Sequence, residues 1–291
     1  MKTFLDCVPC FLKQALGAAR MASDDPEAHA RVLRAVAKAV SEMDMDDTPP
    51  SMGQVIHRVV REATGRQDPY REVKDRFNAL ALSLYARLKS MVAESDDPFG
   101  TAVRLAVAGN IIDFGVSSDI DEESLERSIS ESLAWPLEDG ALDALRLAVD
   151  SADDILYVGD NAGEIVFDRV LIEEMDTDRV TFVVRGAPII NDVTMRDAVE
   201  VGLTDIVAVV DNGSDAPGTI LSDCSQEFHE RFLSADVIIA KGQGNYETLS
   251  QAPGRIFFVL KVKCPVIARD IGCDVGAVVI RARHGPACDR D

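Results

Sequence analysis

The sequence has little positive charge, little histidine and no long apolar run. It contains 30 Lys and Arg residues against 50 Asp and Glu, and its formal net charge is −20. A chain this acidic is unsuited to nucleic acid, whose phosphates need a basic face, and to an anionic membrane surface. No apolar run approaches the length of a membrane span, and the N-terminus lacks the apolar segment of a signal peptide. We therefore expect a soluble cytoplasmic protein that binds neither nucleic acid nor membranes.

The spacing of the apolar residues changes near Asp150. Before this point, apolar residues recur at helical intervals from Cys7 to about Ser128, with no strand pattern. After it, short apolar runs alternate with helical segments, which is typical of a parallel sheet with crossover helices. We expect an all-helical domain at residues 1–125, then a Rossmann-like α/β domain at 126–291 with a mostly parallel, doubly wound sheet. The expected strands are Ile155–Val158, Val180–Val184, Ile206–Val210, Val237–Ile239 and Ile256–Leu260.

Polar residues follow each of these strands. The carboxyl ends of parallel strands share one edge of the sheet, and ligands of open α/β folds bind at that edge. Asp160 and Asn161, after the first strand, offer two adjacent oxygen donors that suit a hard cation such as Mg²⁺ or Mn²⁺. The other residues that we expect at this edge are Arg185, Asn191, Asp192, Asp211, Asn212, Lys241, Asn245, Glu247, Lys261 and Lys263.

Several familiar signatures are absent from these turns. The turn at 158–164 (VGDNAGE) lacks the G-x-G-x-x-G of dinucleotide-binding folds, and the turn at 241–247 (KGQGNYE) lacks the Gly-Lys-Ser/Thr order of a P-loop. There is no G-x-S-x-G nucleophile elbow, and none of the four histidines lies in the turns. Carboxylates, a hard cation and lysines remain, and three of the eight lysines fall between positions 241 and 263. This combination favours phosphoryl transfer or hydrolysis of an anionic substrate.

These residues also have purely structural interpretations. Asp160 and Asn161 are good helix-capping residues, and one such turn alone would favour a cap. The lysines have an alternative role as counter-charges to Asp160, Asp192 and Asp211, because an unrelieved cluster of carboxylates is costly. Five polar strand ends in one chain exceed what capping explains, so we favour a ligand site.

Cys7 and Cys10 form a C-x-x-C sequence in front of a helix, a position typical of reactive thiols. The βαβ context of a thioredoxin-like motif is missing here. A zinc site would need two further ligands, which His284 and Cys288 are spaced to supply. Packed or weakly metal-binding thiols are the favoured interpretation, and a second metal or thiol site at Cys7 and Cys10 stays open.

Several motifs together resemble the damage-control phosphatase family, formerly a domain-of-unknown-function family, number eighty-nine. The C-x-x-C pair suggests its archaeal and bacterial branch. The motifs occur in the family's order and span nearly the whole chain. They are CVPC at 7–10, AGNIIDFG at 108–115, GDNAGE at 159–164, INDVT at 190–194, DNGSDAPGT at 211–219, KGQGNYET at 241–248 and LKVKC at 260–264.

The resemblance implies a helical domain packed on a Rossmann-like domain, and a divalent-metal-dependent phosphatase of small phosphorylated metabolites. It places the metal on Asp160, Asn161 and Asp192, which then form the catalytic centre, and the substrate phosphate on Lys263. Where the family's better-studied branch has Arg-Thr-x-Lys, this chain reads Leu-Lys-Val-Lys at 260–263, which leaves the role of that arginine open.

The resemblance also adds residues from the helical region. Asn110 and Asp113, at the end of an expected helix at 98–112, would line the cleft. Lys74 and Asn78 lie one helical turn apart, and there we expect an exposed helix face rather than the cleft. The expected cofactor is Mg²⁺, Mn²⁺, Co²⁺ or Ni²⁺, and the expected partner is a small phosphorylated metabolite such as a sugar or cofactor phosphate.

Two other functions are compatible with the same pattern. One is a Rossmann-like methyltransferase that uses S-adenosylmethionine, although Asp160 stands where a glycine turn would be expected. The other is a non-catalytic module that binds a metal or a metabolite. Phosphate release with and without a chelator separates the three functions. The sequence leaves open the metabolite and the nucleophile, which is either Asp160 or a water molecule.

Overall fold

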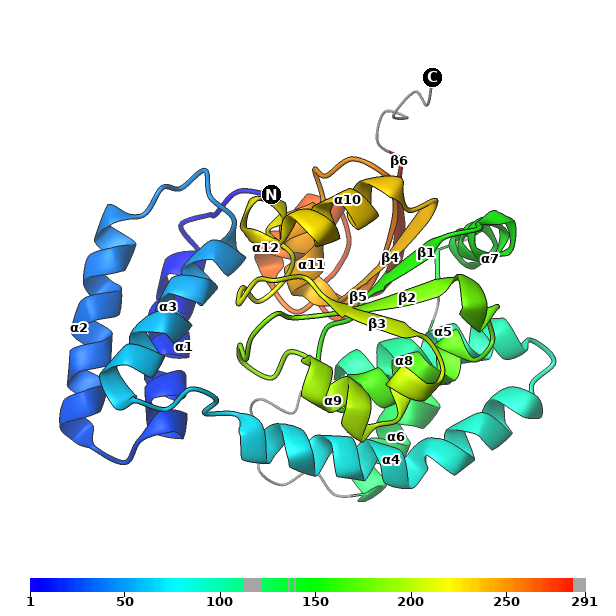
Figure 1. Cartoon of the computed structure of the whole chain (residues 1–291), viewed down its shortest axis with the longest axis horizontal. Helices are drawn as coiled ribbons and strands as arrows, with labels where there is room; N and C mark the ends of the chain where they lie inside the picture. Colours follow the sequence, from blue (N-terminus) through cyan, green and yellow to red (C-terminus); the bar gives the residue numbers. More distant parts are fainter. Residues whose placement is uncertain (112–121, 136, 139, 285–291) are drawn as a thin grey trace.

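The structure is a computed structural model, and it describes residues 1–111, 122–135, 137–138 and 140–284. Figure 1 shows the N-terminal helices beside a larger α/β body. Local sequence sets their ends, because a proline opens the second and third helices and Gly65, with a φ of 73°, closes the third. The three helices are α1 (Cys7–Ala22), α2 (Pro26–Glu42) and α3 (Pro49–Thr64).

These three helices, called here the helical unit, have a hydrophobic core of their own. Phe11 and Ala15 of α1, Val32 and Val36 of α2, and Ile56 of α3 are buried together in it. The residues recur at three- and four-residue intervals, which places them on one face of each helix. The core of the helical unit is therefore separate from the two core clusters of the α/β body.

The α/β body is built on a six-stranded sheet with the order β3-β2-β1-β4-β5-β6. Strands β1 to β5 are parallel, and β6 runs antiparallel to β5. From β1 the chain first builds the sheet outward on one side and later on the other. The point where the order reverses, between the ends of β1 and β4, is where such folds bind ligands. The strands are β1 (Ile155–Val158), β2 (Val180–Val184), β3 (Ala208–Asp211), β4 (Val237–Lys241), β5 (Arg255–Lys261) and β6 (Val278–His284).

The expected fold class is confirmed, since a mostly helical region precedes a mostly parallel sheet. The five expected strands are present within a few residues of their expected bounds. Strand β3 begins later than expected because Leu203–Asp205 form a short 3-10 turn before it. Strand β6 was not predicted, because Arg281 and Arg283 interrupt its apolar pattern at the sheet edge.

Helices cover both faces of the sheet, as Figure 1 shows. Because side chains alternate along a strand, Ile155 and Tyr157 of β1 join the core on one face while Leu156 and Val158 join the core on the other. On the first face pack α4 (Arg71–Ala93), α5 (Pro98–Ile111), α6 (Glu122–Leu133), α7 (Ala141–Ser151), α8 (Glu164–Ile172) and α9 (Met195–Glu200), and on the second α10 (Gln226–Ser234), α11 (Gly242–Leu249) and α12 (Pro265–Ile271).

Helices α4 and α5 belong to the core of the α/β body. Leu84 of α4 and Val103 of α5 lie in the same hydrophobic cluster as Ile155 of β1. By core packing alone, the chain divides between α3 and α4. The domain boundary that we expect near residue 125 stays a prediction.

Asp215, in the loop after β3, holds the helical unit to the α/β body. Arg58 and Arg61 of α3 form ion pairs with its carboxylate, and the Gln54 amide donates to it at 2.7 Å. Burial opposes ionisation, but these partners hold the pKa of Asp215 below its usual range. Pro217 of the same loop lies against Gly53, so α3 is fixed over the edge of the sheet.

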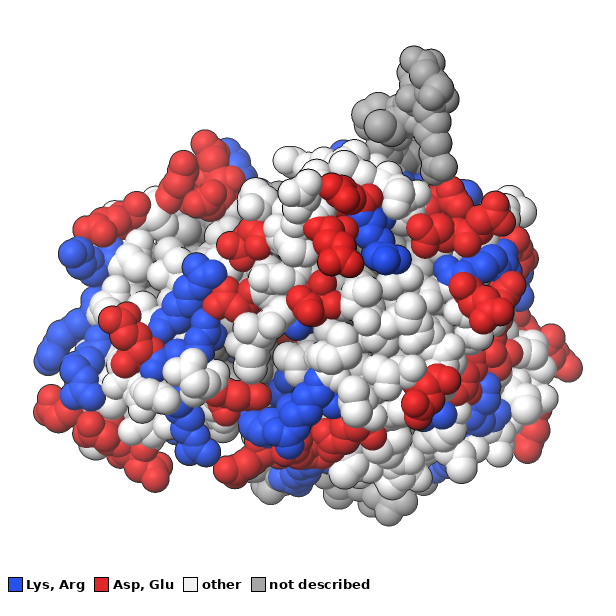
Figure 2. Space-filling model, viewed as in Figure 1, with Lys and Arg blue, Asp and Glu red and all other residues white. Residues whose placement is uncertain are grey.

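Charge is mixed over the surface in view. Figure 2 shows acidic and basic side chains interspersed on this face of the molecule. Among the described residues, no helix is both long and apolar enough to cross a lipid bilayer.

Candidate active site

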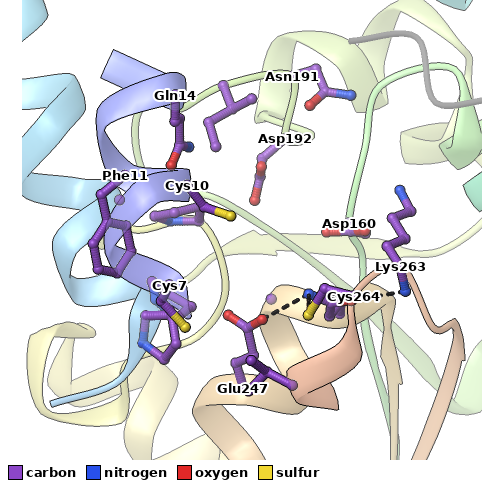
Figure 3. A pocket seen from close by; sticks show the side chains of 18 of the residues that line it. Cys7, Cys10, Phe11, Gln14, Asp160, Asn191, Asp192, Glu247, Lys263 and Cys264 are labelled. Carbon is purple, nitrogen blue, oxygen red and sulfur yellow. Dashed lines mark hydrogen bonds between the residues drawn. The ribbon is translucent and has the colours of Figure 1, made fainter. Parts of the chain in front are cut away.

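A cavity of about 530 Å³ lies between the helical unit and the carboxyl edge of the sheet. In Figure 3, α1 stands on one side with Cys10 and Gln14, and Asp160 and Lys263 lie on the other. The turns after β1 and β2, helix α11 and the segment after β5 complete its walls. The cavity therefore coincides with the reversal of strand order, where a ligand is expected in this fold.

Asp160, Asn161 and Asp192 all line this cavity. Asn161 and Asp192 face each other in an isolated antiparallel bridge. Two main-chain hydrogen bonds stabilise this bridge. Ala162 N donates to Asn191 O at 2.9 Å, and Val193 N donates to Asp160 O at 2.8 Å. The structure thus brings the three expected metal ligands together through the path of the main chain.

Buried charged side chains beneath the cavity orient Asn161 through hydrogen bonds. Its amide nitrogen donates to Asp160 Oδ2 at 2.8 Å and to Glu164 Oε2 at 3.0 Å. The other Glu164 oxygen accepts from Lys241 Nζ at 2.7 Å. Because both amide hydrogens of Asn161 point to carboxylates, its amide oxygen is the atom that it can present to a cation.

Lys241 belongs to this support and does not line the cavity. Its ammonium group is fully buried and donates to Glu164, to Asp168 Oδ1 at 2.6 Å and to the Ala106 carbonyl oxygen at 2.9 Å. An ammonium has three hydrogens to donate, and these contacts use all of them. Burial raises the pKa of Asp168 to about 6 even beside this lysine. Lys241 is thus a counter-charge, but to Glu164 and Asp168 rather than to the expected Asp160, Asp192 and Asp211.

Arg185 and Asn245 also lie beneath the cavity. The buried guanidinium of Arg185 donates from Nε to Asp192 Oδ2 at 2.8 Å and so fixes that carboxylate. Asn245 accepts from Thr219 Oγ1 at 2.8 Å and donates to the Gly159 carbonyl oxygen at 3.1 Å. Both residues therefore position the turns that carry the candidate ligands, and neither is among the described residues that line the cavity.

Four other expected residues do not contribute described side chains to the cavity lining. Asp211 is exposed and accepts from Gly213 N at 3.0 Å, while the buried Asn212 accepts from Gly186 N at 3.1 Å. Both shape the loop after β3, outside the cavity lining. Asn110 is the penultimate residue of α5 with a side chain outside the description, and Asp113 lies outside the described residues.

Two expected residues line the cavity near the segment after β5. The exposed Lys263 stands beside Asp160 in Figure 3, and its charge opposes the rise in the pKa of that carboxyl group. Glu247 of α11 lies lower in the view, and its Oε1 accepts from Gln243 Nε2 at 2.8 Å. Burial raises the pKa of Glu247 to about 7 in spite of this hydrogen bond.

The thiols of Cys7 and Cys10 line the cavity together with that of Cys264. Burial raises the pKa of Cys7. Within the described residues, no group of three or more His, Cys, Asp or Glu side chains is arranged to hold a metal ion. Cys288, one of the two further ligands in the zinc hypothesis, lies outside the described residues. A second site at Cys7 and Cys10 stays a prediction.

The candidate metal ligands belong to a cluster of carboxylates. Burial raises the pKa of Asp160 well above its ordinary value, and the charges of Glu164 and Asp192 raise it further. Burial likewise raises the pKa of Asp192, against the opposing charge of Arg185. Such a cluster gains from a bound cation. Two carboxylates and an amide oxygen form a donor set that fits a hard divalent ion.

Three supporting residues were not assigned to the site from the sequence. Gly242 has a φ of 76°, and a Cβ there would stand 1.8 Å from Asp160 Oδ2, so only glycine leaves room for that carboxylate. Asn78 of α4 accepts from Gly163 N at 2.7 Å, and Lys74 pairs with Asp197 at 2.7 Å. The signal for Gly242 was the Lys-Gly-Gln-Gly sequence after β4.

The expectation of an exposed face at Lys74 and Asn78 was wrong, because both side chains are fully buried. Helix α4 packs its polar stripe against the turn before α8 and against α9. Burial disfavours the charge of Asp197, but Lys74 and the hydrogen bonds from Thr194 and Arg71 lower its pKa to about 2. The pair is thus an internal brace between α4 and the candidate site.

Comparison with known proteins extends these observations. The chain matches the model of the damage-control phosphatase ARMT1-like domain over residues 3–279. It is 36% identical over 284 residues to a damage-control phosphatase of Pyrococcus horikoshii, covering 96% of this chain and 97% of the relative. It is also 36% identical over 287 residues to a damage-control phosphatase of Archaeoglobus fulgidus, covering 94% and 97%.

A solved structure agrees with these sequence relatives. The crystal structure of a DUF89 family protein from Pyrococcus horikoshii resembles this chain with a TM-score of 0.88 at 35% identity. The likeness covers 97% of this chain and 99% of that chain. Fold, motifs and relatives agree, and the chain belongs to the damage-control phosphatase family.

Proposed function

We propose that this chain hydrolyses phosphomonoesters of small metabolites and that Asp160, Asn161 and Asp192 hold the divalent cation that the reaction needs. One observation supports this above all: the three side chains reach the same cavity from two neighbouring strand ends. The family supports a phosphatase, whereas the cation and the substrate class are our inference. Mg²⁺, Mn²⁺, Co²⁺ and Ni²⁺ are all compatible with these donors.

Each residue has a definite task in this proposal. Lys263 binds the non-bridging oxygens of the substrate phosphate, because its ammonium group lies at the cavity opposite α1. Arg185 keeps Asp192 in place, and Asn161 is oriented by Glu164. When bound, the cation would act as a Lewis acid that neutralises the charge on the phosphoryl oxygens. Asp160 either attacks phosphorus or accepts a proton from an attacking water molecule.

The decisive experiment is phosphate release from a panel of sugar, nucleotide and cofactor phosphates, with each of the four cations and with EDTA. We expect release that stops with EDTA and returns when a cation is restored. The Asp192→Asn variant should lose this activity while remaining folded, and Asp150→Asn, an exposed carboxylate on α7, should retain it. Cation-independent release, or an active Asp192→Asn variant, would refute the proposed metal site. Trapping of an acyl phosphate on Asp160 would identify the nucleophile.

A further inference from the structure

The cavity is larger than a phosphate group requires. Its volume of about 530 Å³ falls in the range of sites for small metabolites and cofactors. Lys263 and Asp160 stand at one side, so a phosphate bound there leaves the space toward α1 for the rest of the substrate. The lining of the cavity also includes Phe11, Pro50 and Val266, which favour contact with an apolar section of a ligand.

The charges around the cavity are unequal. Among the described residues that line it, Asp6, Asp160, Asp192 and Glu247 are acidic, and Lys263 is the basic one. Asp6 is already paired with Arg269 at 2.9 Å. If the cation and Lys263 neutralise the substrate phosphate, no positive side chain of the described lining is left for a second anion. A substrate with a further phosphate or carboxylate would therefore meet repulsion from Glu247.

Glu247 is the polar residue best placed to form a hydrogen bond with the part of the substrate beyond the phosphate. Gln243 occupies its Oε1 at 2.8 Å, so Oε2 is the oxygen open to a ligand. The same glutamine accepts from Lys263 N at 3.1 Å and thereby joins Glu247 to the segment that carries the phosphate-binding lysine. Burial disfavours the carboxylate form of this residue more than the Gln243 hydrogen bond and the charge of the N-terminal ammonium group favour it, so a further donor from the ligand would stabilise it.

We propose that Glu247 selects substrates whose body carries a hydrogen-bond donor, best an ammonium group, and no second negative charge. This inference rests on the proposed phosphatase function and adds the substrate class to it. The preferred substrate is then a phosphomonoester with an apolar section and an amino group. Bisphosphates and phosphorylated carboxylic acids are disfavoured.

A matched series of alkyl phosphates tests this proposal. Amino, methyl or carboxylate groups at the far end of three- and five-carbon chains keep the phosphate constant and vary the terminal charge. At about pH 8, where Glu247 is ionised, we expect kcat/KM for the better amino ester to exceed that for the matching carboxylate by roughly tenfold or more. The dissociation constants of the corresponding phosphonates, measured by calorimetry without turnover, should follow the same order.

The Glu247→Gln variant should reduce this preference, measured as the ratio of kcat/KM for the amino ester to kcat/KM for the carboxylate ester, roughly tenfold. Glu230→Gln is the matched control, because Gln226 donates to Glu230 at 2.9 Å in an equivalent exposed pair on α10. Equal use of amino and carboxylate esters by the unmodified protein, or an unchanged preference in Glu247→Gln, would overturn the proposal. If the phosphonates bind in the expected order but no ester is hydrolysed, the phosphatase function fails and the selectivity of Glu247 stands.

Discussion

The floor and the wall of the cavity are held in different ways. The floor is the turn after β1, supported by Glu164, Lys241 and Asp168, and its charges are buried and joined by contacts of 2.6–2.7 Å. The wall meant here is the one formed by the helical unit, which has a separate apolar core. Ion pairs from the half-exposed Arg58 and from Arg61 to Asp215 hold this unit to the α/β body. A floor of this kind fixes chemistry, whereas a separately packed wall can change and so alter which substrate fits.

The largest expected effect comes from breaking the floor. Lys241→Met would leave Glu164 and Asp168 buried without their counter-charge, so we expect a loss of roughly 3–5 kcal/mol in the free energy of unfolding. Urea denaturation measures this loss. Lys261→Met, at a half-buried lysine on the end of β5, is the control and should cost far less. Equal stability of the two variants would mean that the ionic support is not needed.

A subtler change to the floor should disable the site and spare the fold. Gly242→Ala places a Cβ against Asp160 and should lower kcat/KM by roughly a hundredfold, because that carboxylate must move. Gly254→Ala carries a similar left-handed strain at a φ of 108°, but its nearest neighbour is Ile238 at 3.5 Å. Activity should therefore survive in this control. Comparable kinetics in both variants would show that the position of Asp160 is not critical.

Lys263 sharpens the contrast with Lys241. Lys263→Met should lower kcat/KM roughly ten- to hundredfold by loss of a charge-assisted contact to phosphate. Its unfolding free energy should change little, since the side chain is exposed. Steady-state kinetics and denaturation on the same preparation separate the two lysines. Intact kcat/KM on the best substrate would move phosphate binding away from Lys263.

The helical unit should respond to pH through His57. Burial, with help from the charge of Arg61, lowers the pKa of His57 in α3 to about 4, from about 6.5 when unfolded. The unfolded chain therefore binds the proton first, and stability is lost as pH falls from 6.5 toward 4, by at most about 1.4 kcal/mol per pH unit. A plot of melting temperature against pH should be flatter for His57→Phe than for the unmodified protein between pH 6.5 and 4. The same plot for His229→Gln should keep the slope of the unmodified protein.

The sequence predicts positions along the chain better than directions of side chains. The adjacency of Asp160, Asn161 and Asp192 was predictable because β1 and β2 are parallel neighbours, which places their ends together. Lys241 ends a strand in the same way, but it turns inward to Glu164 and Asp168, and nothing in the local sequence gives that direction. Long-range burial decides it.

The same limit explains the two misjudged elements. The polar stripe of α4 that holds Lys74 and Asn78 looks like an exposed helix face, because its partners in the turn before α8 and on α9 are more than eighty residues away. The sequence of strand β6 lacks a regular apolar pattern, because a strand at the edge of a sheet tolerates arginines. In both cases the partner, rather than the segment, determines the structure.

The main-chain bridge between Asn161 and Asp192 would make this scaffold suitable for engineering selectivity for the proposed cation. Because backbone groups form the bridge, the positions of the ligands depend on the path of the chain and not on the ligand side chains themselves. At Asp192, exchange of carboxylate for amide leaves an oxygen that can accept from Arg185, so it would lower the charge offered to an ion while the main chain keeps its path. Comparison of the unmodified protein with Asp192→Asn would then show how ligand charge ranks the divalent ions on one main-chain geometry.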